Sequence, residues 1–224
     1  PCHRWIVFGV YEGGEGIEFA QGRLKNGGVF VDSGANIGQW LLYLGEIEAL
    51  QTLAFEPVSS QRNWLIECIE TQQNWEVVLF EYALGNKQDT QDIQCNGARS
   101  TFNMDWYAGK GLVKQRVQIR RLDQVLAEQQ IDEVTLWKID VEGTELQALQ
   151  GATDYLKAKR IKTIYFECIP TNFNRICELL HSYGYFVYEL NGGKLTETVK
   201  QSIVNTQHFV AVPGGANNQQ EGIK

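Results

Sequence analysis

The chain has no apolar run near the length of about 20 residues that crosses a membrane, and its start lacks the long apolar core of a signal peptide. Its five cysteines are scattered and form no Cys-x-x-Cys pair, which argues against a disulfide framework or a cysteine zinc site. Basic charge is scarce, because 20 lysines and arginines stand against 27 acids and leave a net charge of −7. These absences predict a cytoplasmic protein without a general electrostatic surface for nucleic acid or membrane.

With 224 residues, the chain is long enough for one α/β domain with a full core. Strand-like and helix-like segments alternate, which predicts a mostly parallel sheet with helices on both faces. We expect strands over 29–32, 53–56, 77–83, 134–140 and 161–168, followed by two final strands over 185–190 and 208–212. The expected helices cover 37–46, 59–70, 122–130, 144–156 and 172–182.

The remaining segments suggest how the domain is bounded. Residues 1–28 are too irregular to assign and could cover the site, whereas 29–213 form the domain itself. A polar, glycine-bearing insertion around 85–119 has short extended pieces near Ile93, Thr101 and Val117, and we expect it to lie over the site. Residues 214–224 are rich in glycine and amides and are expected to form a flexible tail or linker.

The most specific motif is the segment from Val29 to Gly38, where an apolar strand runs into Asp-x-Gly-x-x-x-Gly. A dinucleotide fold would instead have Gly-x-Gly-x-x-Gly, whose second glycine lets the backbone approach a pyrophosphate. A ligand without phosphate does not need that residue. Gly34 and Gly38 would permit the tight turn between the strand and the next helix.

S-adenosylmethionine is a ligand of this kind. Asp32 suits its ammonium group, and the helix expected to begin near Asn36 could offer backbone N–H groups to its carboxylate. Glu56, at the end of the next strand, could accept hydrogen bonds from the two ribose hydroxyls. Taken singly, either acid could equally be a helix N-cap, and Asn36 could cap the following helix while it holds the loop.

A second motif, Leu136 to Glu145, also runs from a strand into acidic residues and a glycine. Lys138 and Asp140 share one face of the strand and could form an internal ion pair, a structural role that we favour slightly for Lys138. Asp140 and Glu142 could each accept a proton, hold the acceptor or bind a metal. Glu145 is expected in the first helical turn, where its charge meets the helix dipole.

Both motifs together resemble those of the FkbM family of methyltransferases, with Val31 to Gly38 and Lys138 to Glu145 in the expected order. Between them, Tyr82-Ala-Leu-Gly85 and Arg121-Leu-Asp123 resemble the connecting signatures of that family. The resemblance implies a Rossmann-like class I fold, in which the two final strands are an antiparallel pair. It also implies that S-adenosylmethionine is the methyl donor and that the acceptor is usually a hydroxyl group, on a small molecule, a sugar or a natural-product intermediate, free or carrier-bound.

The resemblance and the strand ends together suggest roles for individual residues. The expected cofactor contacts are Asp32, Gly34, Ala35, Asn36, Gly38, Glu56, Pro57, Ala83, Leu84 and Asp140, and the candidate catalytic residues are Lys138, Asp140 and Glu142. Trp106 and Tyr107, in the insertion, are candidates for substrate binding.

A metal-assisted reaction is the alternative mechanism, with Mg²⁺ held by Asp140 and Glu167. We favour a reaction without metal, because Glu167 is not followed by the second acid or amide that is usual in such sites. Two other functions stay open: an NAD-dependent oxidoreductase, which the absent Gly-x-Gly-x-x-Gly disfavours, and a non-catalytic binding domain that kept the fold. The sequence sets no oligomeric state.

Overall fold

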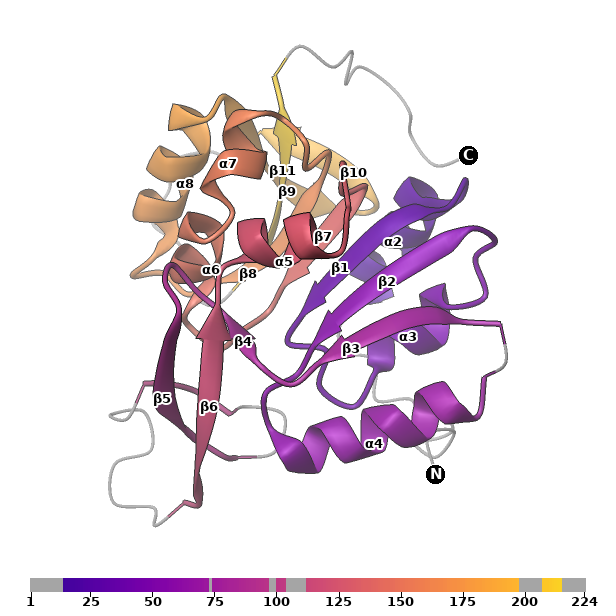
Figure 1. The fold of residues 1–224 in the computed structure, drawn as a ribbon. Coiled ribbons are helices and arrows are strands. Elements are labelled where there is room, and N and C mark those ends of the chain that lie inside the picture. Colours follow the sequence, from indigo (N-terminus) through magenta and orange to yellow (C-terminus); the bar gives the residue numbers. More distant parts are fainter. Residues whose placement is uncertain (1–13, 73, 97–99, 104–111, 198–206, 215–224) are drawn as a thin grey trace.

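A computed structural model describes residues 14–72, 74–96, 100–103, 112–197 and 207–214 (Figure 1). Within these residues the chain forms an eight-stranded main sheet with the strand order β10-β9-β11-β8-β7-β1-β2-β3. The strands are β1 (Gly28–Ser33), β2 (Leu50–Phe55), β3 (Glu76–Phe80), β7 (Leu136–Ile139), β8 (Ile164–Cys168), β9 (Tyr185–Asn191), β10 (Lys194–Glu197) and β11 (Gln207–Pro213).

The direction of the strands locates the place where a ligand can bind. β1 pairs in parallel with β2 on one side and with β7 on the other, and these pairings continue in parallel to β3 and β8. β11 runs antiparallel between β8 and β9, as the resemblance implied. Strand order therefore reverses between β1 and β7, where Asp32 lies opposite Lys138. In open α/β sheets, ligands bind at the carboxyl ends of the strands beside such a reversal.

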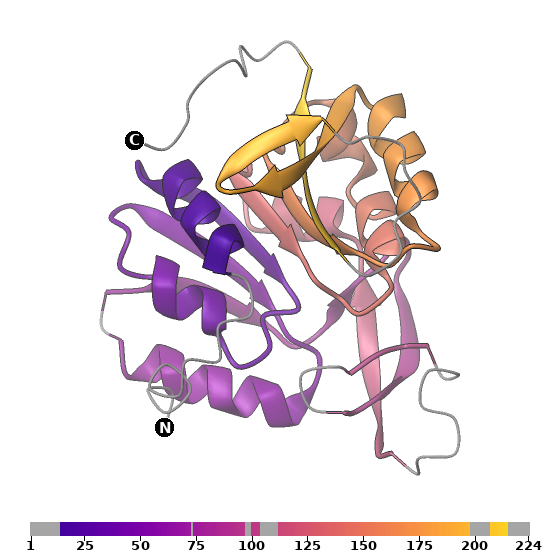
Figure 2. The ribbon, with the colours of Figure 1, turned by 180° about the vertical axis from the view of Figure 1, so that it is seen from behind.

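Helices cover both faces of the main sheet, as expected (Figures 1 and 2). Apolar residues of α2 (Gly14–Leu24), α3 (Gln39–Leu44) and α4 (Ser59–Glu70) share one buried cluster with Phe30 and Leu136 of the sheet. Residues of α5 (Leu122–Glu128), α6 (Glu145–Gln150), α7 (Thr153–Lys157) and α8 (Phe173–Ser182) share the cluster on the other face with Trp137 and Phe166. The alternation of strands and helices predicted this sandwich correctly.

A second, three-stranded sheet lies beyond the ends of the main strands, at the lower left of Figure 1. Its strands are β4 (Ala83–Leu84), β6 (Lys114–Arg120) and β5 (Asp89–Gln94). The single strand expected over 77–83 is wrong in its second half, because β3 ends at Phe80 and Ala83 pairs with Ile119 of β6. The extended pieces expected near Ile93 and Val117 are confirmed as β5 and β6, which pair with each other.

The helix expected over 144–156 is broken into α6 and α7 by Gly151 and Ala152. The carboxylate of Asp123, from α5, accepts hydrogen bonds from the backbone N–H groups of Asp154 and Tyr155, each at 3.2 Å. A new helix can start there because a distant side chain satisfies N–H groups of its first turn. A Cβ at position 151 would lie only 2.1 Å from the backbone oxygen of Gly85, so glycine is required at the break.

Three further details differ from the expectations. α3 begins at Gln39, two residues later than expected, since Gly38 at its N-terminus has the left-handed φ of +89°. α2 lies in the segment that was too irregular to assign, and residues 1–13 are outside the described residues. β10 was not expected, although Gly192 and Gly193, both at positive φ, are a two-residue hairpin signal in the sequence.

Among the described residues, no helix combines the length and apolar character needed to cross a membrane. Within the described part of the chain, Cys95, Cys168 and Cys177 form no disulfide.

Candidate active site

Asp32, at the carboxyl end of β1, is the most deeply buried acid of the site. Its side chain is fully buried, and its one ion-pair partner among the described residues is Lys138, with 3.1 Å between Oδ1 and Nζ. Neither carboxylate oxygen has a hydrogen bond of acceptable geometry within the described part of the chain. Burial raises the pKa of Asp32, and the charge of Lys138 opposes this rise. Asp32 is therefore a buried carboxyl group that can still accept hydrogen bonds.

Lys138, in the neighbouring strand β7, joins the two sequence motifs. Its Nζ donates a hydrogen bond of 2.7 Å to the backbone oxygen of Gly34 and lies 3.6 Å from Oδ2 of Asp140. Burial alone would lower the pKa of Lys138, but the charges of Asp32 and Asp140 raise it above its ordinary value. The ion pair that the shared strand face predicted is present, and it includes Asp32 as well.

The turn after β1 depends on glycine. Gly34 has a φ of +80°, and a Cβ there would lie 1.9 Å from the backbone oxygen of Asp140. Gly38 also has positive φ, and a Cβ there would meet the side chain of Leu65 at 2.6 Å. Asn36 adopts the left-handed region without being glycine. Gly34 thus allows the first motif to fold tightly against the end of β7, and Gly38 allows it to approach α4.

Glu56 follows β2 and closes the other side of this turn. Oε2 accepts a hydrogen bond from the N–H of Asn36 and Oε1 accepts one from the N–H of Val58, both at 2.8 Å. Each oxygen keeps a second lone pair for another donor. Burial raises the pKa of Glu56 to about 7, although both backbone hydrogen bonds oppose the rise. The N–H of Asn36, which precedes the helix, is therefore already bonded to Glu56.

Three carboxyl groups converge at the carboxyl ends of β7 and β8. One carboxylate oxygen from each of Asp140, Glu142 and Glu167 lies within 4.8 Å of the others. The structure therefore brings together both residues of the alternative metal pair and adds Glu142. Burial, followed by the charges of Asp140, Glu142 and Glu145, raises the pKa of Glu167 to about 8. Oxygen ligands of this kind suit Mg²⁺, and the same groups can equally accept a proton from a bound hydroxyl group.

The turn that carries Asp140 and Glu142 is held from three sides. Oε1 of Glu145 accepts hydrogen bonds from the N–H groups of Gly143 (2.9 Å) and Val141 (3.4 Å). Asn172, which precedes α8, donates to the backbone oxygen of Gly143, and Thr101 donates to the backbone oxygen of Glu142. Glu142 is kept in the left-handed region, with a φ of +54°.

Glu145 does lie in the first turn of α6, as expected, but its side chain also binds the preceding turn. Thr101 and Asn172 were not recognised from the sequence. Neither belongs to a motif, and each reaches the site only through the fold, so no local pattern could have identified them.

The other expected site residues are placed as follows. The backbone oxygen of Pro57 accepts hydrogen bonds from Arg62 and Gln115, so the turn after β2 is tied to the second sheet. Ala83 and Leu84 are buried in β4, and Leu84 packs in the cluster beneath α5. Ala35 is buried against α3. Trp106 and Tyr107 lie outside the described residues.

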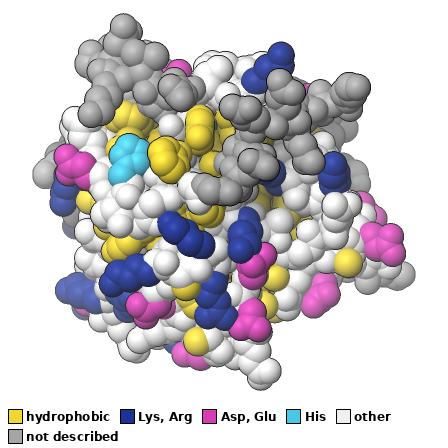
Figure 3. Space-filling model, turned by 90° about the horizontal axis from the view of Figure 1, so that it is seen from above, with side chains coloured by type: hydrophobic (Ala, Val, Ile, Leu, Met, Phe, Trp, Pro, Cys, Tyr) yellow, Lys and Arg dark blue, Asp and Glu magenta, His cyan; other side chains and the backbone are white. Residues whose placement is uncertain are grey.

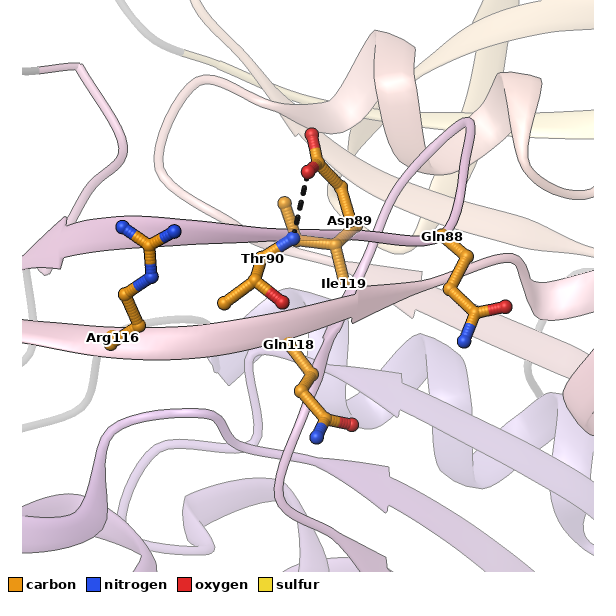
Figure 4. Close-up of a pocket in the computed structure, with 6 residues that line it drawn as sticks. All are labelled: Gln88, Asp89, Thr90, Arg116, Gln118 and Ile119. Carbon is orange, nitrogen blue, oxygen red and sulfur yellow. Dashed lines mark hydrogen bonds between the residues drawn. The ribbon is translucent and has the colours of Figure 1, made fainter.

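A groove of about 380 Å³ lies elsewhere, on β5 and β6, and is lined by Gln88, Asp89, Thr90, Arg116, Gln118 and Ile119 (Figure 4). The carboxylate of Asp89 accepts hydrogen bonds from the N–H of Thr90 and from Gln91 and pairs with Lys87. The guanidinium of Arg116 pairs with Asp92. Both charged side chains are already paired, so the groove resembles a solvated strand face more than a ligand site.

The geometry of the strand ends can now be compared with known proteins. The model of the FkbM methyltransferase domain family matches residues 32–187. The chain belongs to the FkbM methyltransferase family. The match includes Asp32, Glu56, Asp140 and Glu167, so the acids described above lie within the family domain. A search of curated proteins found no significant match.

Solved structures of class I methyltransferases share the fold of this FkbM protein. A TehB-like S-adenosylmethionine-dependent methyltransferase from Corynebacterium glutamicum matches with a TM-score of 0.51 and 11% identity, over 95% of this chain and 94% of that chain. WbdD matches with a TM-score of 0.53 and 10% identity, over 94% of this chain and 42% of that chain. The methyltransferase domain of METTL16 matches with a TM-score of 0.52 and 13% identity, over 88% and 65%. At these identities the likeness concerns the fold alone.

The family and the fold imply S-adenosylmethionine as the methyl donor. The residues of this chain fit that group, because the orphaned oxygens of buried Asp32 match an ammonium donor and Glu56 keeps free lone pairs for hydroxyl donors. The first motif lacks the second glycine that lets the backbone of a dinucleotide fold approach a pyrophosphate.

Proposed function

We propose that this FkbM methyltransferase transfers the methyl group of S-adenosylmethionine to a hydroxyl group of a small molecule, a sugar or a natural-product intermediate, free or carrier-bound. The observation that carries the proposal is the convergence of Asp140, Glu142 and Glu167 at the strand ends beside Asp32. A hydroxyl acceptor must lose a proton during methylation, and Asp140 or Glu142 is the carboxylate proposed to receive it.

Few protein groups are needed for this reaction. When bound, S-adenosylmethionine supplies an electrophilic methyl group, and the protein aligns the acceptor with it. Asp32 and Glu56 hold the two ends of the cofactor, while Asp140 or Glu142 accepts the acceptor proton. The turn of Asp140 and Glu142 is fixed by Glu145, which keeps these groups in place before the acceptor binds. We keep the reaction without metal as the favoured mechanism.

The insertion is proposed to recognise the acceptor. Thr101 ties it to the turn of Glu142, and Gln115 ties it to Pro57. Trp106 and Tyr107 belong to this segment and are proposed to line the acceptor pocket. Loops and small elements carried on a rigid sheet commonly hold recognition residues.

We propose a cytoplasmic enzyme that binds neither nucleic acid nor membrane. The net charge of −7 supports this, as does the face seen in Figure 3, where lysines and arginines lie among acidic side chains. On the described surface, Arg160 pairs with Asp132 and Lys162 pairs with Glu133. Such paired charges attract phosphate backbones weakly.

Calorimetry with S-adenosylhomocysteine and with NAD tests the cofactor part of the proposal. We expect binding heat only with S-adenosylhomocysteine, and heat only with NAD would favour the oxidoreductase. The acceptor part is tested by transfer of a labelled methyl group to panels of hydroxyl compounds, amines and RNA. Label on the hydroxyl panel alone supports the proposal, and label on amines or RNA alone contradicts it.

A further inference from the structure

The ammonium group of Lys138 is surrounded by oxygens of the protein. An ammonium group has three N–H donors, and three oxygens surround this one: the backbone oxygen of Gly34 at 2.7 Å, Oδ1 of Asp32 at 3.1 Å and Oδ2 of Asp140 at 3.6 Å. The side chain is also buried, with 3% of the residue exposed. Lys138 is therefore engaged by protein oxygens and is poorly placed to meet the acceptor.

The charges around Lys138 show what it does for Asp32. Asp32 and Glu56 are both buried at the same sheet edge, and each raises the cost of ionising the other. A buried carboxylate without a partner tends to become protonated. Among the described residues, Lys138 is the basic group that pairs with Asp32. Without this cation, Asp32 would lose the charge that an ammonium ligand recognises.

We propose that Lys138 is a positioning residue for the methyl donor, which keeps Asp32 ionised and fixed by its Oδ1 so that Oδ2 receives the ammonium group of S-adenosylmethionine. This rests on the proposed function. Oδ2 of Asp32 is fully buried and has no hydrogen-bond partner within the described residues, so it offers an acceptor that the protein itself leaves open. One carboxylate then lies between two cations, the fixed Lys138 and the bound ligand. The bond from Lys138 to Gly34 also fixes the turn beside the ligand.

Two ligands separate this role from a general structural one. S-adenosylhomocysteine carries the ammonium group, whereas 5′-methylthioadenosine has the same adenosine and thioether but no amino-acid part. We expect Lys138→Met to weaken binding of S-adenosylhomocysteine about tenfold or more, the effect of one lost charge-assisted hydrogen bond. Binding of 5′-methylthioadenosine should stay within about twofold of the wild type. Isothermal calorimetry on the wild type and on Lys138→Met gives the dissociation constant of each ligand.

The matched control is Lys162→Met, which removes a surface lysine paired with Glu133, and it should change neither constant. Equal weakening of both ligands by Lys138→Met, or no weakening of either, would overturn the proposal. A wild-type protein that binds neither ligand would contradict the proposed function itself, which distinguishes the two failures.

Lys138→Met leaves the buried carboxyl group of Asp32 and the partly exposed one of Asp140 without their cation and could prevent folding. The double variant Asp32→Asn with Lys138→Met removes the whole buried ion pair and avoids an uncompensated charge. It is expected to bind 5′-methylthioadenosine as the wild type does and S-adenosylhomocysteine at least about tenfold more weakly. A double variant that binds S-adenosylhomocysteine as tightly as the wild type would refute the role of the pair.

Discussion

Thr101 donates a hydrogen bond from its Oγ1 to the backbone oxygen of Glu142 at 2.8 Å, across 41 residues of sequence. Thr101 is fully buried, and its own backbone pairs with Gln94 at the end of β5. The second sheet is thereby connected directly to the turn that carries two of the converging acids. A change in this sheet can therefore reach Asp140 and Glu142 without passing through Asp32 or Glu56.

Thr101→Val should lower turnover while the affinity for S-adenosylhomocysteine stays unchanged. The variant keeps the shape of the side chain but leaves the backbone oxygen of Glu142 without this donor, at a cost of about 1 kcal/mol in the free energy of unfolding. Turnover with an identified acceptor, calorimetry and thermal melting measure the three quantities. Thr90→Val, on the exposed face of β5, is the matched control. Lost cofactor affinity in Thr101→Val would show that this link serves the fold rather than the turn of Glu142.

Gly34→Ala should lower the free energy of unfolding several times more than Gly192→Ala does, or abolish cofactor binding. Both glycines have positive φ, so both substitutions carry a conformational cost of about 1 kcal/mol. Only position 34 also has a backbone oxygen 1.9 Å from the added Cβ, while nothing lies within 4 Å at position 192. Urea unfolding of the two variants measures the difference. Equal free energies of unfolding would mean that the turn can move away from Asp140.

Glu56→Ala should weaken S-adenosylhomocysteine binding, because it removes the proposed acceptor for the ribose hydroxyls and the bond that holds Asn36. The ligand should raise the melting temperature of the wild type, since it binds only the native state. This shift should shrink in the variant. Glu67→Ala, on the exposed face of α4, should leave the shift intact. A full shift in Glu56→Ala would remove Glu56 from the cofactor site.

Glu145→Gln should raise the stability of the protein at pH 8 and not at pH 4. Burial raises the pKa of Glu145 from 4.5 to about 7, so the folded state holds the proton more tightly than the unfolded state. That stabilisation is complete below pH 4.5 and is lost as the pH rises through 7, to an extent of about 3 kcal/mol. The glutamine variant stays neutral and avoids the loss. The measurement is the difference in free energy of unfolding between variant and wild type at both pH values, and a difference independent of pH would contradict the burial of an ionisable group there.

Asp140→Asn should reduce turnover far more than cofactor affinity, since it removes a charge at the proposed reacting end of the site while preserving the size of the side chain.

Activity of the wild type should survive complete chelation by EDTA. Loss of activity that added Mg²⁺ restores would instead support a metal held by Asp140, Glu142 and Glu167. An unchanged rate in Asp140→Asn would leave Asp140 with only its pairing to Lys138.

The sequence predicted those parts of the fold whose signals are local. β1 and β7 are short apolar runs that end in acids, so their ends and the pairing of Lys138 with Asp140 followed from strand alternation. The break between α6 and α7 could not be predicted, because it depends on a carboxylate from α5. α2 could not be predicted either. Its Gly16 is needed because a Cβ there would lie 2.4 Å from the hydroxyl oxygen of Tyr165, a residue far away in the sequence.

The candidate site was predictable to a similar extent. Asp140 and Glu142 were identified from their motif, whereas Glu167 was considered only for its place at the end of the next strand. The fold brings all three together. The groups that hold this cluster, Thr101 and Asn172, come from segments without a motif. Side chains that position others leave little local pattern, since their partners are fixed by the tertiary structure.

The first and last strands of the second sheet, β4 and β6, are neighbours in space although they are far apart along the chain. Ala83 and Leu84 of β4 lie beside Ile119 and Arg120 of β6, so the peptide that leaves the main domain returns to it one strand away. A segment attached in this way can be lengthened, shortened or exchanged between related enzymes without moving β1, β2 or β7. Because the insertion is proposed to recognise the acceptor, grafts joined at residues 94 and 114, which pair with each other, would test whether the acceptor changes with the segment.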